Sequence, residues 1–232
     1  MAVSGVAAFN LDLSEIVEEA FERCGSEMRT GYDLRTARRS MNLMFADWAN
    51  RGVNMWTFEQ GSISLIPGQA TYDLPVDTVD LMEHVIRTGA GSASTQADLT
   101  ITRISVSTYA TIPNKLQQAR PIQIWIERLE TPRVTVWPVP DNSQPYTLVY
   151  WRLRRIDDAG NGVNTMDVPF RFLNAMVAGL SYYLSVKIPG AADRVGMLKQ
   201  QYDEAWLLAS EEDREKAAVR MVPRQQFIGS GT

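Results

Sequence analysis

Residues 33–51 carry the pattern that most constrains the fold of this chain. Apolar side chains recur there at three- and four-residue spacing, as on one face of a helix: Ala37, Met41, Met44, Phe45 and Trp48. Asp33 is a suitable N-cap, and Gly52 suits the left-handed backbone position just past a helix end. Aromatic-rich residues typical of strands follow at once. The segment therefore predicts a core-facing helix joined by a sharp turn to a β layer.

Three further segments show a helical period. Residues 13–24 place Glu15, Glu18, Glu19 and Glu22 opposite an apolar stripe, so we expect an amphipathic helix with a solvated acidic face. Residues 168–187 carry a broader apolar stripe, which is typical of a largely buried helix. Residues 192–217 predict a last helix with an exposed, charged end. No single helix could hide these apolar stripes, so we expect one shared core, with these residues buried: Met44, Trp48, Phe172, Met176 and Trp206.

The middle of the chain has the two-residue period of strands. Apolar residues alternate with polar ones at 63–65, 99–102, 122–127 and 134–136, and residues 146–153 are apolar on both faces. Turn signals such as Pro67-Gly68 and Pro140-Asp141-Asn142 separate these runs. About seven short strands with this spacing favour a small antiparallel sandwich or barrel. The segment 105–112 is a candidate short helix.

The chain thus divides into four parts of an α+β protein. Residues 1–55 and 161–217 are predicted to supply the N- and C-terminal helix pairs of one bundle. Residues 56–160 are predicted to form a β domain inserted between these pairs. Residues 218–232 differ in composition from the helices before them and are predicted to form an extended C-terminal segment. Pro223 blocks a helix there, and Gly229-Ser230-Gly231 favours an irregular backbone.

Three stretches of sequence resemble a known family. They are Asp47-Trp48-Ala49-Asn50-Arg51-Gly52, then Asn54-Met55-Trp56, then the run Gly68-Gln69-Ala70-Thr71-Tyr72-Asp73-Leu74-Pro75. Together they resemble the head-to-tail adaptor proteins of short-tailed bacteriophages, also called connector or head completion proteins. The resemblance covers residues 10–75 in motif and residues 165–220 in the layout of helices.

The resemblance implies a structural virion protein at the head-tail interface, made in the host cytoplasm. Such an adaptor forms a homo-oligomeric ring, twelvefold by analogy, under the portal protein. The ring extends the DNA channel, through which the genome passes without specific binding, and it provides the platform for a tail or nozzle protein. The pattern of residues 33–74 itself predicts a structural joint between helix and β layer, made of Trp48, Arg51, Gly52 and Trp56.

The C-terminal residues 218–232 contain two arginines, no acid and five apolar side chains. One interpretation is a disordered end or a strip folded back on its own domain. The other is a docking arm that becomes ordered on a partner. Because these adaptors grip the portal with a C-terminal extension, the resemblance implies portal-binding roles for Arg220, Met221, Val222, Arg224, Phe227 and Ile228.

Composition excludes several kinds of chemistry. His84 is the only histidine and Cys24 the only cysteine, so multi-histidine metal sites and an intrachain disulfide cannot form. The single cysteine fits a reducing cytoplasm, and the N-terminus is a poor signal peptide. No apolar run approaches the roughly 20 residues needed to cross a bilayer. We expect no catalytic residues, no cofactor and no bound metal.

Charged groups leave a few alternatives open. Asp157-Asp158 is a candidate carboxylate pair, although a turn is favoured, and Asp77, Asp80 and Glu83 lack a dense ligand loop. The cluster Arg152, Arg154 and Arg155 is expected to pair with acidic neighbours, such as an adjacent subunit's first helix, rather than with nucleic acid. Net charge is −4, and no arginine-lysine stripe is expected along any helix, so a ring lumen should be acidic or neutral.

The four tryptophans of the β region suggest a second function class. Trp56, Trp125, Trp137 and Trp151 are expected to fill the β core or an interface between subunits. Tryptophans also stack on sugars, and a glycosidase needs only two carboxylates. The alternative hypothesis is therefore a carbohydrate-binding or glycan-cleaving β domain with helical flanks.

Overall fold

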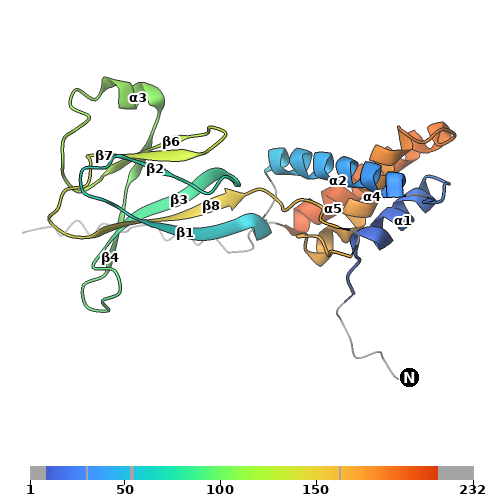
Figure 1. Ribbon diagram of the computed structural model, residues 1–232, viewed down its shortest axis with the longest axis horizontal. Coiled ribbons are helices and arrows are strands. Elements are labelled where there is room, and N and C mark those ends of the chain that lie inside the picture. Colours follow the sequence, from blue (N-terminus) through green and yellow to red (C-terminus); the bar gives the residue numbers. More distant parts are fainter. Residues whose placement is uncertain (1–8, 30, 53–54, 162, 214–232) are drawn as a thin grey trace, which may run out of the picture.

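The computed structural model describes residues 9–29, 31–52, 55–161 and 163–213. Helices from both ends of the sequence form one lobe, and the strands between them form a second lobe beside it (Figure 1). The protein is therefore mixed α+β, as the sequence predicts. Among the described residues, no helix has the length and hydropathy needed to cross a membrane.

The helical lobe has one hydrophobic core, to which segments far apart in sequence contribute. Its long helices are α1 (Leu13–Arg23), α2 (Gly31–Arg51), α4 (Leu173–Ser185) and α5 (Val195–Glu212). Short 3-10 turns, η2 (Phe170–Phe172) and η3 (Ala192–Arg194), lead into α4 and α5. Helix α4 packs against the other three, which explains its broad apolar stripe. Met44, Trp48, Phe172, Met176 and Trp206 are all buried in this core, as predicted.

The ends of the first two helices are fixed differently. Asp12 and Glu15 form a capping box at the start of α1, in which each side chain accepts the other residue's backbone N–H. The prediction that Asp33 caps α2 is wrong, because the helix already begins at Gly31. Asp33 lies in the first turn, and its carboxylate accepts the backbone N–H of Arg29 at 3.1 Å.

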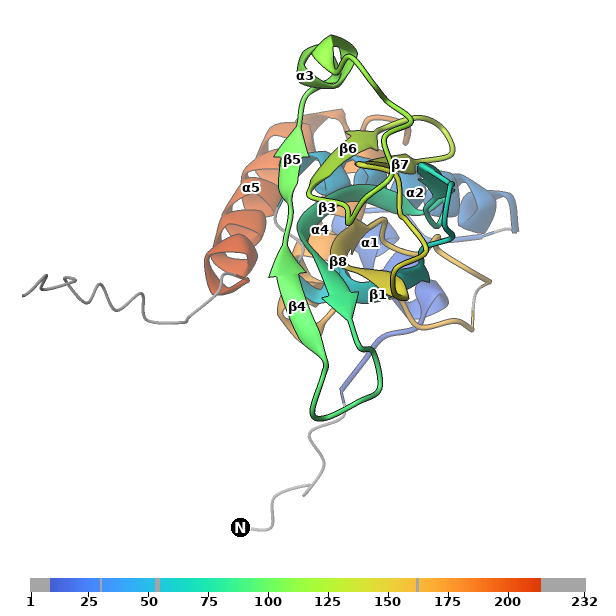
Figure 2. The ribbon, with the colours of Figure 1, turned by 90° about the vertical axis from the view of Figure 1, so that its left-hand side faces the viewer.

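The β lobe consists of two four-stranded sheets. After the turn η1 (Met55–Thr57), the strands are β1 (Phe58–Ser64), β2 (Thr71–Asp73), β3 (Thr78–Thr88), β4 (Ala97–Thr100), β5 (Thr102–Ile104), β6 (Gln123–Glu127), β7 (Arg133–Trp137) and β8 (Tyr146–Arg154). One sheet has the order β1-β8-β3-β4 and the other β2-β7-β6-β5. Figure 2 shows β4 and β5 in succession, so the chain changes sheets at the buried Ile101. The short helix α3 (Val106–Thr111) follows β5, as predicted for residues 105–112.

Two features of the β lobe differ from the sequence prediction. Strands β5 and β6 are parallel, so the second sheet is mixed rather than antiparallel, and the described strands form no closed barrel. The prediction also omits β3, the longest strand. Irregularities in its pairing with β8, between Thr78 and Asp80 and between Leu81 and Glu83, break the two-residue alternation that marks a strand in sequence.

The two sheets share a second hydrophobic core. It is built from aliphatic and tyrosine side chains such as Ile86, Ile124, Leu148 and Tyr150. The sequence predicts that the tryptophans fill this core or an interface between subunits. The first of these alternatives is wrong, while the second stays a prediction. Trp125, Trp137 and Trp151 are only half-buried, and Trp125 stacks on Tyr109 with ring centroids 4.9 Å apart.

Candidate functional site

Trp48 is the centre of the junction where the helices meet the β lobe. It is fully buried, and its indole Nε1 donates a hydrogen bond to Tyr202 Oη at 2.8 Å. Its ring packs on Phe172 of η2 and Trp206 of α5, with centroid distances of 5.6 and 4.8 Å. A residue at the end of α2 therefore links the N-terminal and C-terminal halves of the helical lobe.

Arg51 and Gly52 lie at the end of α2, where the chain turns toward the β lobe. The Arg51 guanidinium carbon is 4.8 Å from the ring centroid of Trp206. The Nη2 atom of the same group pairs with the Asp47 carboxylate at 2.8 Å. Gly52 has φ of +72°, as predicted for the position past the helix end. The helix thus stops here because glycine adopts this conformation without steric cost.

We predict that Gly52→Val lowers the free energy of unfolding by about 1 to 3 kcal/mol. A Cβ atom at this position would meet none of the described residues within 4 Å, so the expected cost is backbone strain. Gly52→Asn is the matched control, because asparagine tolerates positive φ far better than a β-branched residue does. Chemical denaturation of the two variants measures the difference. Equal stabilities would contradict a strained position.

Trp56 and Arg154 attach the β lobe to the helices through a single residue, Asp167. The Trp56 Nε1 donates to the backbone carbonyl of Asp167 at 2.9 Å, and Arg154 at the end of β8 pairs with its carboxylate at 2.6 Å. Trp56 also packs on Phe172 with ring centroids 4.7 Å apart. The two strands that leave and enter the helical lobe are therefore held at one point. Asp167 lies outside any periodic segment, so the sequence pattern gives no signal for it.

Arg171 completes this joint on the C-terminal side. Its guanidinium carbon lies 5.9 Å from the Trp56 ring centroid, and its Nε donates to Asp213 Oδ1 at 3.0 Å. The Asp213 side chain is fully buried, so this ion pair fixes the end of α5 against the start of α4. The predicted joint of Trp48, Arg51, Gly52 and Trp56 is thus contiguous in space through Phe172 and Trp206.

The basic cluster at the end of β8 is paired within its own chain. Arg152, a buried residue, contacts Asp77 at 2.6 Å and Glu59 at 2.5 Å. Hydrogen bonding to this guanidinium lowers the pKa of Asp77 below its ordinary value. Arg154 pairs with Asp167, as described above, and Arg155 donates to the carbonyl of Val76. The favoured acidic pairing is confirmed for Arg152 and Arg154, with partners of the same chain, but not for Arg155 among the described residues.

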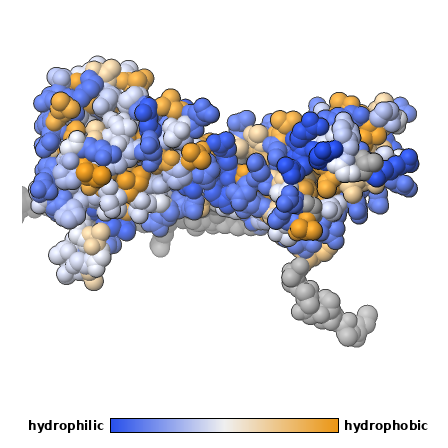
Figure 3. Space-filling model, in the orientation of Figure 1, coloured by the Kyte–Doolittle hydropathy of each residue, from blue (hydrophilic) through white to orange (hydrophobic). Residues whose placement is uncertain are grey.

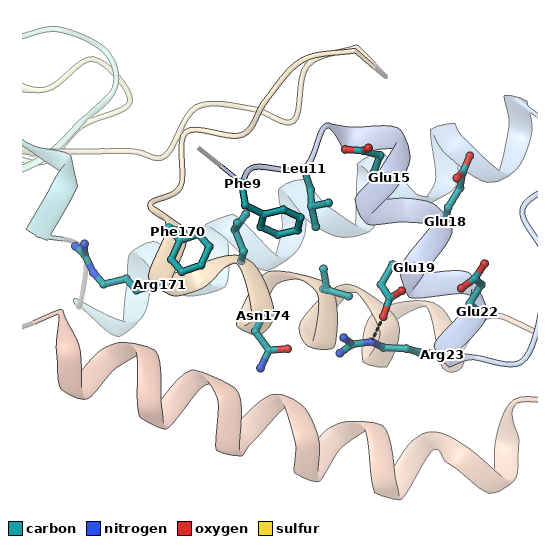
Figure 4. Close-up of a pocket in the computed structure, with 12 residues that line it drawn as sticks. Phe9, Leu11, Glu15, Glu18, Glu19, Glu22, Arg23, Phe170, Arg171 and Asn174 are labelled. Carbon is teal, nitrogen blue, oxygen red and sulfur yellow. Dashed lines mark hydrogen bonds and ion pairs between the residues drawn. The ribbon is translucent and has the colours of Figure 1, made fainter. Parts of the chain in front are cut away.

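A groove with a volume of 610 Å³ runs between α1 and α4 (Figure 4). Its apolar walls are Phe9, Leu11, Phe170, Leu173 and Val177. Phe9 and Phe170 meet edge to face at 6.4 Å, yet they are 64% and 70% exposed. The predicted acidic face of α1 forms the rim, through Glu15, Glu18, Glu19 and Glu22. Arg23 and Arg171 also line the groove, but they pair with Glu19 and Asp213. The groove therefore combines an apolar lining with a net negative charge from the remaining glutamates.

Helix α2 presents positive charge on its outer face. Arg35, Arg38 and Arg39 are exposed there, and strongly hydrophilic side chains gather over α2 in Figure 3. The expectation that no helix carries an arginine stripe is therefore wrong. The apolar stripe of α2 places the arginines on the other faces of the helix. Only the packing of α2 against α4 shows that these arginines are exposed.

Few of the candidate chemical groups come together. Asp157 and Asp158 are exposed in the segment after β8, while Asp77 and Asp80 pair with arginines. His84 is half-buried, and burial lowers the pKa of its imidazole. Burial also raises the pKa of the Cys24 thiol to about 11. In the described part of the chain, no group of three or more histidine, cysteine or acidic side chains is placed to hold a metal ion.

The geometry is that of two lobes held together by a joint, with charged helix faces exposed among the described residues. A family model described as SU10 adaptor protein matches residues 11–224, and the chain belongs to this family. The match confirms the resemblance to phage head-to-tail adaptors and implies a location in the virion. No curated protein matches the chain. The predicted portal-binding residues, Arg220, Met221, Val222, Arg224, Phe227 and Ile228, lie outside the described residues.

Proposed function

We propose that this protein forms a ring between the portal and the tail, continues the DNA channel and acts without catalysis. The observation that carries the proposal is the family match, which spans both lobes and the helices at both ends. The joint at Trp56 and Asp167 supports it, because a platform that transmits the position of the portal to the tail needs lobes that do not rotate freely. Copies of the chain, twelve by analogy, and the portal and tail proteins are its partners.

The helices and the β lobe have separate tasks in this proposal. The helices behave as one bundle, because Trp48, Phe172 and Trp206 come from three different segments and share one core. The bundle carries the β lobe, and residues 218–232 act as the portal-gripping arm. The chain is made in the host cytoplasm and waits there for a completed portal.

We predict that deletion of residues 218–232 leaves the melting temperature unchanged but abolishes assembly on portal rings. The described residues of both hydrophobic cores all precede residue 214, so the deletion removes none of them. One arm should bind weakly, and a ring of arms should bind strongly through multivalency. Mass photometry of the protein mixed with purified portal gives the readout. Assembly equal to that of the full chain would show that the grip lies elsewhere.

The same mixture tests the general proposal. The full chain should add a defined number of copies to each portal ring and should turn over no glycan. The alternative β-domain hypothesis predicts a different result. In that case the full chain would cleave a glycan, and it would neither associate with portal nor form rings at any concentration.

We predict weak binding to DNA, with a dissociation constant above about 1 µM at physiological salt. The net charge of −4 opposes nonspecific binding to phosphates, and a channel must let the genome slide. Filter binding of the isolated chain to duplex DNA measures this affinity. Tighter binding would contradict a passive channel and would point to the arginines of α2.

A further inference from the structure

We propose that neighbouring copies in the ring join by placing the outer face of α2 of one copy into the α1–α4 groove of the next. The inference rests on the proposed ring and names the surfaces that build it. Among the described residues both surfaces are exposed, and they carry opposite charge. The occupant of the groove is therefore a second copy of this chain.

The acidic surface has charges that the chain itself does not neutralise. Glu19 pairs with Arg23 at 2.8 Å, and Glu15 is used in the capping box. Glu18 and Glu22 are one helical turn apart and exposed, and across the described ranges neither forms an ion pair. They flank the apolar floor of the groove, from which Phe9 and Phe170 protrude.

The basic surface is a narrow ridge along α2. Tyr32, Arg35, Arg39 and Leu43 are spaced by three, four and four residues, which aligns them on one side of a helix. Tyr32 and Leu43 are 63% and 62% exposed, although both are large and apolar. Arg35 and Arg39 make no ion pair among the residues that the structure describes. The ridge thus offers apolar ends and a positive middle, the complement of the groove.

The two surfaces lie on different sides of the helical lobe. Helix α4 packs between α1 and α2, and in Figure 4 the groove faces the viewer while α2 passes behind α4. A contact between two different faces is heterologous, so each copy keeps one free face for the next. Such a contact repeats around a ring and closes when the rotation per copy divides the circle. A helix laid into a groove is also a common recognition mode.

Charge reversal tests this contact. One variant carries Glu18→Lys and Glu22→Lys, and the other carries Arg35→Glu and Arg39→Glu. Each variant alone places like charges across every contact, so half-maximal ring formation on portal should require at least about tenfold more protein. The assay uses full-length chains with purified portal and counts copies by mass photometry.

An equal mixture of the two variants provides the decisive measurement. The first variant has two basic surfaces and the second has two acidic ones, so alternating copies restore opposite charges at every contact. Ring formation should return to within about threefold of the original protein. If the substituted residues contacted the portal instead of a neighbouring copy, mixing would not restore ring formation. Each copy would still carry its own damaged portal contact.

Matched controls separate this effect from a general change of charge. Asp203→Lys with Glu211→Lys reverses two exposed acids of α5, and Lys199→Glu with Arg120→Glu reverses one exposed base of α5 and one of the β lobe. Both controls should assemble as the original chain does. If a reversal variant fails to fold, Leu43→Asp replaces it, because this exposed side chain would bring an acid toward the glutamates of the neighbour.

Two results would overturn the inference while leaving the proposed function standing. In the first, the original chain forms rings on portal and both reversal variants do so equally well. In the second, the variants fail alone and fail equally when mixed. An original chain that forms no ring under any condition would overturn the proposed ring and this contact together.

Discussion

Replacing Trp48 by alanine is expected to lower the free energy of unfolding by about 3 to 5 kcal/mol, as large aromatic-to-alanine changes in a core do. The side chain is fully buried among Phe45, Phe172 and Trp206, so its loss leaves a cavity where three segments meet. The indole also donates to Tyr202, whose hydroxyl loses a hydrogen-bond partner in the variant. Urea denaturation followed by circular dichroism at a helical wavelength measures the change.

Tyr202→Phe is the control for the hydrogen bond alone. It keeps the ring and removes the hydroxyl that accepts from Trp48, so we expect a loss of about 1 to 2 kcal/mol. Burial raises the pKa of Tyr202 to about 12, so this hydroxyl stays protonated throughout the usual pH range. A Trp48→Ala variant no less stable than Tyr202→Phe would show that the tryptophan ring does not support the core.

Replacing Arg152 by leucine is expected to cost about 2 to 4 kcal/mol. Arg152 is 8% exposed, and its guanidinium bridges Glu59 of β1 and Asp77 before β3, so it ties three neighbouring strands together. Removing one member of a buried ion pair is strongly destabilising, but these carboxylates are about half exposed and regain water, which reduces the cost. The exposed Arg155 is the control, and Arg155→Leu should change stability by less than about 1 kcal/mol.

The loss in the Arg152 variant should depend on pH. In the folded chain, the hydrogen bond to Arg152 lowers the pKa of the Asp77 carboxyl below its ordinary value of 3.8. Its contribution to stability is therefore complete at neutral pH and is lost as the pH falls below 3.8 toward the lowered value. Unfolding measured at pH 7 and at pH 3 should show a larger difference between variant and original chain at pH 7. An equal difference at both values would contradict a role for the ionised carboxylate.

Several elements follow from the pattern of residues close together in sequence. The stripe of α2, the turn at Gly52 and the short helix α3 were predictable, because period and glycine conformation depend on residues close in sequence. Strand β3 was not predictable, because its pairing irregularities with β8 disrupt the alternation. The parallel pairing of β5 with β6 also escaped prediction, since the partner of a strand is set by a contact distant along the chain.

The candidate site shows the same division. The sequence by itself determined the residue types of the joint and the acidic stripe of α1, because helical spacing alone aligns those side chains. Only the tertiary structure decided that Asp167 holds both Trp56 and Arg154, and that Arg152 pairs inside its own chain. The physical reason is that ion pairs and packed rings depend on distances of a few ångströms between residues far apart in sequence, such as Trp56 and Asp167, which are 111 positions apart. The charge and spacing of residues along the chain do not specify distances in space. The groove and the ridge are therefore defined only by the packing of the helices.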